Sequence, residues 1–164
     1  MAETIAEGDR LPEGELIRFG ADGPEAVSVS ELTAGRRVVL FAVPGAFTST
    51  CHSAHMPSFV RTADEFRDKG VDAIYCVAVN DPFVLRAWGE ATGAPGAGIE
   101  MLSDASGAFS RSIGMTFDAP ARGLIGRSRR YAMLVEDGAV RVLRAEDNPG
   151  ACDVSGGETL LEAI

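Results

Sequence analysis

The 164-residue sequence has few of the features that mark membrane, nucleic-acid-binding or repetitive proteins. Acidic residues outnumber basic ones by 24 to 15, which gives a net charge of −9. This balance disfavours nucleic acid and anionic membranes as partners, because both attract basic surfaces. No apolar run approaches the ~18 residues that a membrane span needs. Low-complexity tracts and repeats are also missing, so we expect one globular domain over residues 1–164.

Cysteine is scarce as well, with three residues in the chain. An odd number of cysteines without framework spacing is typical of a reducing compartment rather than of a secreted disulfide scaffold. Residues 1–12 are acidic and poor in apolar side chains, unlike a signal or transit peptide. We therefore expect a cytoplasmic protein. No C-x-x-C pair occurs, which counts against a thiol–disulfide oxidoreductase acting on proteins.

Carboxylates are missing from one stretch, between Glu31 and Asp64, although Asp and Glu make up 24 of the 164 residues. Cys51 lies within this stretch, after an apolar segment that leads through Pro44 and Gly45 into a helical pattern. A thiol at a helix start meets unpaired amide groups and the positive end of the helix dipole, which favour the thiolate. The sequence therefore predicts a reactive cysteine, against the commoner alternative of a buried and inert one.

Apolar periodicity predicts strands and helices in alternation along most of the chain. The predicted strands are 36–43, 71–79, 99–102, 131–135 and 139–143, and the predicted helices are 51–69, 81–93, 106–113 and 155–164. Before residue 36 we expect an N-terminal extension, with a small hairpin (16–19 and 26–29) and a helical turn (30–34). This order predicts an α/β protein with a central mixed sheet and helices on both faces, which is the thioredoxin-like arrangement.

The residues around Cys51 resemble those of a known enzyme family. Pro44, Thr48 and Cys51 fit the pattern P-x-x-x-T-x-x-C of the peroxiredoxins. The whole approach to the cysteine, followed by His55 and Pro57, is similar to the type II (atypical) branch of that family. Two positions depart from the branch: Ser49, where proline is usual, and His52, where serine is common.

Later segments extend the resemblance. Residues 77–84, followed by Trp88, are similar to the second strand and the next helix of the type II branch. Residues 127–132 look like its arginine-bearing strand. Together with the cysteine motif, these segments cover approximately residues 36–160.

The resemblance implies a thiol peroxidase that reduces hydrogen peroxide and alkyl hydroperoxides through a sulfenic acid at Cys51, without metal or other cofactor. In this displacement the thiolate attacks one oxygen while charge grows on the other, so hydrogen-bond donors must meet that charge. Thr48 can orient the peroxide, or Thr48 or Ser49 can cap the first turn of the helix. Pro44 can shield the pocket or simply end the strand.

Arg130 stands where the family has its active-site arginine. A guanidinium at this place would hold the thiolate and stabilise the transition state. From the residues alone, Arg127 and Arg129 are equal candidates, because a basic run is usually a solvated face.

The remaining histidines and cysteines have less definite roles. We expect His55, one helical turn after the thiol, to satisfy a backbone group, and His52 to lie at the surface. Cys76 falls in a predicted apolar strand and favours core packing, whereas Cys152 follows the last strand in a turn. Either could resolve the sulfenic acid, but a disulfide needs close Cα atoms, so we favour recycling by an external thiol.

The reductant stays open between glutaredoxin with glutathione and thioredoxin. A redox sensor or holdase that uses the same thiol without turnover is the main alternative function. The family also implies a homodimer, formed by the surface around the active-site helix and by apolar residues near Phe83 and 107–109, which we expect to be exposed.

Overall fold

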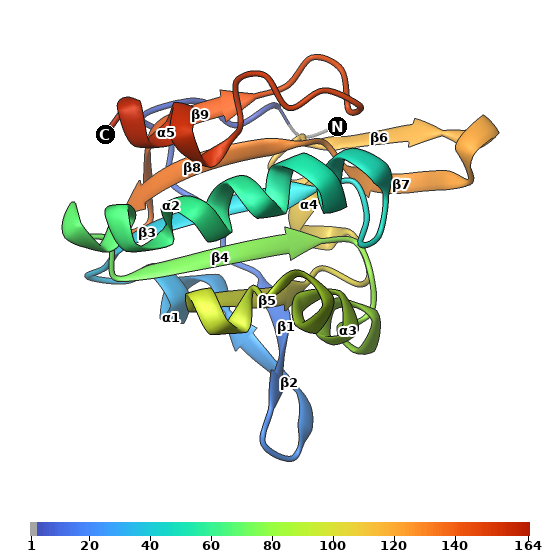
Figure 1. Cartoon of the computed structure of the whole chain (residues 1–164), viewed down its shortest axis with the longest axis horizontal. Coiled ribbons are helices and arrows are strands. Elements are labelled where there is room, and N and C mark those ends of the chain that lie inside the picture. The colour runs from blue at the N-terminus through green and yellow to red at the C-terminus, as the bar shows by residue number, and fades with distance from the viewer. Residues whose placement is uncertain (1–2) are drawn as a thin grey trace.

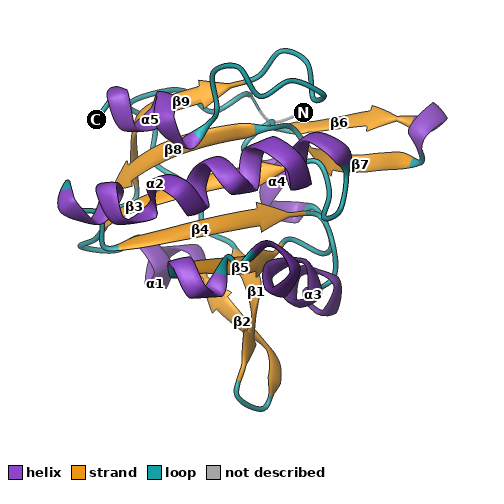
Figure 2. Ribbon diagram, viewed as in Figure 1, coloured by secondary structure: helices purple, strands orange, loops and turns teal. Residues whose placement is uncertain are grey.

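The computed structural model describes residues 3–164 and is built around one large sheet (Figures 1 and 2). The strands are β1 (Glu15–Gly20), β2 (Gly23–Ser28), β3 (Arg37–Val43), β4 (Ala73–Ala78), β5 (Ile99–Ser103), β6 (Thr116–Ala119), β7 (Leu124–Ser128), β8 (Tyr131–Glu136) and β9 (Ala139–Ala145). The helices are α1 (Val29–Thr33), α2 (Met56–Asp68), α3 (Pro82–Thr92), α4 (Ala108–Ser112) and α5 (Gly157–Glu162), with a π-helical turn at Cys51–His55. Short 3₁₀ turns occur at Pro95–Ala97 and Pro120–Arg122.

The large sheet is mixed, as the sequence predicts. Its strand order is β2-β1-β5-β4-β3-β8-β9. The central pairs β3–β4 and β4–β5 are parallel, and the outer pairs are antiparallel. The N-terminal extension is part of this sheet, because β1 pairs with β5 through Ile17 and Ser103.

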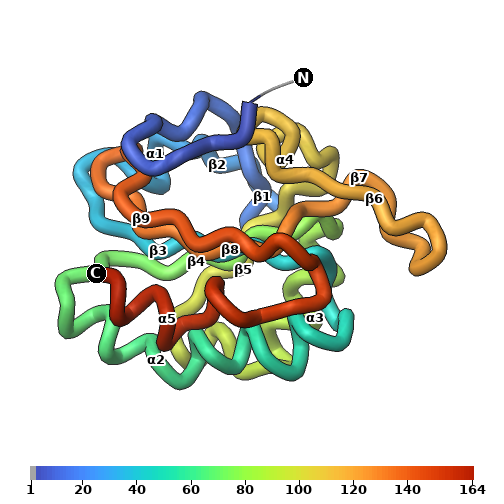
Figure 3. Tube along the Cα trace, turned by 90° about the horizontal axis from the view of Figure 1, so that it is seen from above, coloured from blue at the N-terminus to red at the C-terminus, as the bar shows by residue number. Residues whose placement is uncertain are grey.

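Helices cover both faces of the sheet, so the protein has two cores (Figure 3). Successive residues of β3 face opposite cores, as the two-residue period of a strand requires. Phe41 packs under α2, α3 and α5, whereas Leu40 packs toward α1 and α4. The predicted thioredoxin-like arrangement is confirmed. The helices fill the two cores with large side chains, among them Phe59, Phe66, Trp88 and Leu160 on one face, and Leu32 and Phe109 on the other.

The β6–β7 hairpin is the main element that the sequence did not predict. Its strands pair through Thr116 with Ser128 and Phe117 with Arg127, in a separate two-stranded sheet. The proline and glycines of residues 116–128 resemble a loop in sequence, and only the pairing makes strands of them. This hairpin extends from the body of the molecule beside the end of β8 where Tyr131 lies (Figure 1).

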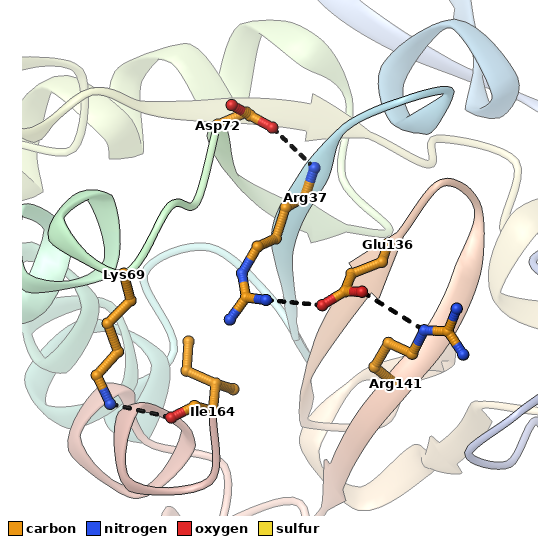
Figure 4. A network of polar contacts seen from close by, with 6 residues as sticks. All are labelled: Arg37, Lys69, Asp72, Glu136, Arg141 and Ile164. Atoms are coloured by element: carbon orange, nitrogen blue, oxygen red, sulfur yellow. Dashed lines mark hydrogen bonds and ion pairs between the residues drawn. The ribbon is translucent and has the colours of Figure 1, made fainter.

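A polar network ties the strands together at the end of β3 that lies away from Cys51 (Figure 4). The backbone N–H of Arg37 donates to Asp72, and its guanidinium pairs with Glu136 at 2.7 Å. Glu136 also lies 3.6 Å from Arg141. Because these side chains are about one third or more exposed, each pair contributes roughly 0.2–1 kcal/mol. Lys69 donates to the carbonyl of Ile164 at 3.0 Å and so holds the last helix against α2.

Candidate active site

Cys51 lies just beyond the end of β3 at the start of a helix, as predicted. The strand ends at Val43, the chain turns through Pro44 and Gly45, and helical backbone begins at Ser49. The Cys51 side chain is 0% exposed and packs in the core under α2. Between the end of β3 and the helix, a Cβ at Gly45 would approach the Arg127 guanidinium to 2.8 Å, so a side chain there would displace this arginine.

The first turn of the predicted 51–69 helix is a π turn rather than an α turn. The backbone N–H of Met56 donates to the carbonyl of Cys51, five residues earlier. Pro57 follows, and it has no N–H with which to continue the α-helical ladder. The regular α2 helix therefore begins only at Met56, and Cys51 lies on a widened turn of a kind that often occurs at functional sites.

The guanidinium of Arg130 contacts the sulfur of Cys51. Its Nη2 lies 3.2 Å from Cys51 Sγ, and the arginine is 1% exposed. Within the described residues no carboxylate lies within 4.0 Å of this guanidinium. A buried cation without a carboxylate partner favours an anion beside it, and the nearest sulfur is the group that can supply one as a thiolate.

His55 supports the arginine rather than the sulfur. Its Nε2 bonds to the carbonyl of Ser155 at 2.9 Å, so Nε2 carries the proton and Nδ1 accepts from Arg130 Nη1 at 3.0 Å. Burial, followed by the charge of Arg130, lowers the pKa of His55 to about 3. The predicted role of His55, to satisfy a backbone group, agrees with this geometry.

The segment between β9 and α5, residues 147–155, closes the site. The carbonyl of Pro149 accepts from both Nε and Nη2 of Arg130, at 3.2 and 3.0 Å. The neighbouring carbonyl of Gly150 accepts from the Thr50 hydroxyl at 2.7 Å, which ties the segment to the start of the helix. The guanidinium is therefore held on three sides, by the sulfur, by His55 and by Pro149.

Thr48 and Pro44 line an open cavity of about 660 Å³ that leads to Arg130. The Thr48 hydroxyl donates to the carbonyl of Gly45 at 2.7 Å, so it does not cap the helix, and that alternative is wrong for Thr48. Its oxygen keeps lone pairs that can accept from a ligand in the cavity. The rest of the wall comes from the helix start, the β6–β7 hairpin and residues 148–151, and includes Phe47, Phe117, Arg122 and Leu124.

The other two cysteines lie in different surroundings. Cys76 is fully buried in β4, as predicted, and burial raises the pKa of its thiol well above the usual range, with Cys51 adding to the rise. Cys152 is half-buried in the 147–155 segment, and burial raises the pKa of its thiol too. No hydrogen bond joins either sulfur to Cys51 within residues 3–164.

His52 is exposed, as expected, but it has partners. Its Nδ1 accepts from the indole N–H of Trp88 at 3.0 Å, and Phe47 stacks on its ring with centroids 5.9 Å apart. Phe47 itself has a φ of 64°, an uncommon conformation for a residue other than glycine, and is 53% exposed. These contacts join the active-site helix to α3.

Of the apolar residues expected to be exposed, Phe83 is exposed, as predicted. Phe109 is only 3% exposed and belongs to the core beneath α4, so the expected exposure of Phe109 was wrong.

Several contacts that support the site were not predicted from the sequence. Arg127 donates to the carbonyl of Pro44 at 3.3 Å and so supports the turn before the helix instead of touching the sulfur. Arg129 donates to the carbonyl of Glu146 at 3.1 Å. The carbonyls of Pro149 and Ser155 carry no signal in sequence, because every residue has a carbonyl and only the fold brings these two to the arginine.

Residues 3–164 hold no cluster of three or more His, Cys, Asp or Glu side chains placed to bind a metal ion. None of their helices combines the length and the apolar character needed to cross a bilayer.

The chain is similar to known proteins in sequence and in structure. The Redoxin family model matches residues 6–161. Peroxiredoxin-2E-2 of the rice chloroplast (Oryza sativa subsp. japonica) is 50% identical, over 98% of this chain and 73% of its own length. Peroxiredoxin-2B of Arabidopsis thaliana is 42% identical, over 98% of each chain. The crystal structure of reduced Prx3 in complex with hydrogen peroxide, from Vibrio vulnificus, has a TM-score of 0.91 at 44% identity, and the match covers 98% of this chain and 99% of that one.

Proposed function

The chain belongs to the type II branch of the peroxiredoxins, which are thiol-dependent peroxidases, and we propose that Cys51 is the thiol that attacks the peroxide. The observation that carries this proposal is the 3.2 Å contact between Arg130 Nη2 and Cys51 Sγ, two buried groups. A guanidinium that donates to sulfur stabilises the thiolate, which is the nucleophilic form.

The reaction then runs as a displacement at oxygen. The Cys51 thiolate attacks the terminal peroxide oxygen, the O–O bond breaks, and the departing oxygen leaves with its electron pair as an alkoxide or hydroxide that takes up a proton. Cys51 becomes a sulfenic acid, while the peroxide becomes an alcohol or water. Arg130 faces both the sulfur and the cavity, so its positive charge can meet the negative charge that develops on the oxygens.

Thr48 and Pro44 would set the direction of attack. The Thr48 hydroxyl donates a hydrogen bond to the carbonyl of Gly45, so its oxygen can accept a hydrogen bond from the peroxide O–H and align the O–O bond with the sulfur. Pro44 adds an apolar wall without a backbone N–H, which limits the entry of water to the sulfur.

We propose that an external thiol completes the cycle. The raised pKa values of Cys76 and Cys152 keep both thiols protonated near neutral pH, and a protonated thiol attacks a sulfenic acid slowly. A small thiol or the thiolate of a partner protein needs only access through the cavity. Glutaredoxin with glutathione is our first choice of reductant, and thioredoxin is the second.

We also propose the domain organisation, the cellular location, the substrates and the oligomeric state of the protein. Residues 1–164 form a single domain, which the family match over 6–161 supports. We place the protein in the cytoplasm because its three cysteines are free, although two of its relatives are chloroplastic. Hydrogen peroxide and organic hydroperoxides are the substrates, and the crystal structure of Prx3 with hydrogen peroxide supports the first of these. The exposed Phe83 supports a homodimer.

The deciding experiment measures peroxide consumption by the purified protein with each candidate reductant in turn. Intact mass after one equivalent of peroxide then distinguishes a sulfenic acid from an internal disulfide. Turnover with glutaredoxin and glutathione, with a sulfenic acid on Cys51, is the expected result. Oxidation without any turnover would instead identify a redox sensor.

A further inference from the structure

A buried carboxylate outside the cavity organises the segment that holds Arg130. Glu146 directly follows β9 and is 5% exposed. Its Oε2 accepts three hydrogen bonds, from the backbone N–H of Val154 at 2.8 Å and from the N–H and hydroxyl of Ser155 at 2.7 Å each. The 147–155 segment begins directly after Glu146. One carboxylate oxygen of Glu146 therefore holds the C-terminal end of this segment close to its start.

Two residues of this closed segment supply both carbonyl groups of the active-site network. The carbonyl of Pro149 accepts from Nε and Nη2 of Arg130. The carbonyl of Ser155 accepts from His55, whose other nitrogen accepts from Arg130 Nη1. The guanidinium thus has two protein supports besides the sulfur, and both depend on the path of residues 147–155.

The backbone of Glu146 is anchored to the same part of the fold. Its N–H donates to the carbonyl of Arg130 at 3.0 Å, and its carbonyl accepts from Arg129 at 3.1 Å. The carboxylate therefore starts from a fixed point beside Arg130 and reaches to Ser155. Hydrogen bonds to an ionised acceptor are shorter and stronger than hydrogen bonds between neutral groups. The three bonds to Oε2 therefore hold Val154 and Ser155 firmly against Glu146.

We propose that Glu146 is a positioning residue of the peroxidase, which acts through Ser155, His55 and Pro149 to aim the guanidinium of Arg130 at Cys51. Glu146 touches neither the sulfur nor the cavity. The proposal rests on the assignment of Cys51 and Arg130 made above, and it adds a residue whose loss should slow chemistry without removing any group that contacts peroxide.

The chain offers a matched control in Asp104. This carboxylate is also buried, at 3% exposed, and it also accepts from two backbone amides, of Phe109 and Ser110, and from the Ser110 hydroxyl. None of these partners belongs to the active site. Glu146→Gln and Asp104→Asn therefore remove the same kind of charge and hydrogen bonding at two different places.

The experiment measures the second-order rate of Cys51 oxidation by hydrogen peroxide in wild type, Glu146→Gln and Asp104→Asn, each checked for folding by circular dichroism. We expect Glu146→Gln to lose about tenfold to a hundredfold in rate, as small misplacements of catalytic groups do. Asp104→Asn should keep a rate near that of wild type. The pH profile of the oxidation rate should change in Glu146→Gln alone.

A double-mutant cycle tests the route through the arginine. In an Arg130→Ala background, Glu146→Gln should change the rate by less than about twofold, because its target is already gone. A wild-type rate in folded Glu146→Gln, or an equal loss in both backgrounds, would overturn the proposal. If Glu146→Gln does not fold, Ser155→Ala replaces it, because this change deletes one of the three hydrogen bonds to Glu146. Ser155→Ala should then slow the reaction in the wild-type background but not in the Arg130→Ala background. Cys51→Ser, measured alongside, separates a failure of this proposal from a failure of the Cys51 assignment.

Discussion

The Nη2 atom of Arg130 lies 3.2 Å from the Sγ atom of Cys51, although the two residues are 79 positions apart in sequence. Both side chains are almost completely buried, and the guanidinium has no carboxylate within 4.0 Å among residues 3–164. The same group also donates to His55 and to the carbonyl of Pro149. Arg130 therefore connects the reactive sulfur to two other segments of the chain.

Replacing Arg130 with lysine should reduce the rate of Cys51 oxidation about a hundredfold or more, because a single ammonium cannot contact sulfur, His55 and Pro149 together. Stopped-flow fluorescence can follow the reaction, since Trp88, the only tryptophan, bonds to His52 next to the active cysteine. Arg141→Lys, an exposed change on β9, is the control and should react at the wild-type rate. Equal rates for the two variants would contradict the role given to Arg130.

Cys51→Ser should abolish peroxidase turnover, while Cys76→Ser and Cys152→Ser should each keep the first oxidation step. Of the three thiols, only Cys51 receives a hydrogen bond from a guanidinium. Mass spectrometry after a single turnover locates the sulfenic acid. The double variant Cys76→Ser/Cys152→Ser should keep most of its turnover with glutaredoxin and glutathione. A near-stoichiometric internal disulfide in wild type, with loss of all turnover in the double variant, would show instead that one of these cysteines resolves the intermediate.

Thr48→Val should lower the rate of peroxide reduction about tenfold or more, because valine keeps the shape of threonine but offers no oxygen to the peroxide. Thr48→Ser retains the hydroxyl that donates to the carbonyl of Gly45. Serine should therefore restore most of the rate. If valine and serine were equally active in a peroxide-consumption assay, the hydroxyl would have no part in the reaction.

The stability of the protein should fall as the pH drops, because of His55. Burial lowers the pKa of His55 from 6.5 to about 3 in the folded state, so below pH 6.5 the unfolded chain takes up a proton that the folded chain does not. The free energy of unfolding therefore does not depend on pH through His55 above pH 6.5. Between pH 6.5 and pH 3 it falls by about 1.4 kcal/mol per pH unit. Urea titrations across this range should show a shallower slope for His55→Gln. A folded His55→Gln protein that keeps the wild-type slope would contradict this assignment.

Phe83→Ser should weaken self-association. This side chain is 62% exposed at the start of α3, where burial against a second copy would remove a large apolar surface from water. Ile125 in β7 is equally exposed, at 63%, and Ile125→Ser is the matched control. Sedimentation velocity at micromolar concentration should show a dimer for wild type and Ile125→Ser. A strictly monomeric wild type would remove the proposed dimer altogether.

Features that depend on neighbouring residues could be predicted from the sequence. Apolar periodicity located both central strands and the helices that follow them, because burying one face of an element is a local requirement of its pattern. Asp81 and Gly93 cap α3 as its boundaries predicted, with the Asp81 side chain accepting from Val84. The reactive character assigned to Cys51 came from a helix start without nearby carboxylates, which is also local.

The distant groups that meet the sulfur depend on how the whole chain packs. Arg127, Arg129 and Arg130 are adjacent and alike in sequence, yet packing directs the first to Pro44, the second to Glu146 and the third to Cys51. Of the three, only Arg127 lies within a strand, so the alternation of side chains along a strand does not assign their directions, and long-range packing does. The carboxylate and carbonyl groups that orient Arg130 are likewise common chemical groups, and they act on it because the fold brings the segment after β9 against the first turn of the helix at Cys51.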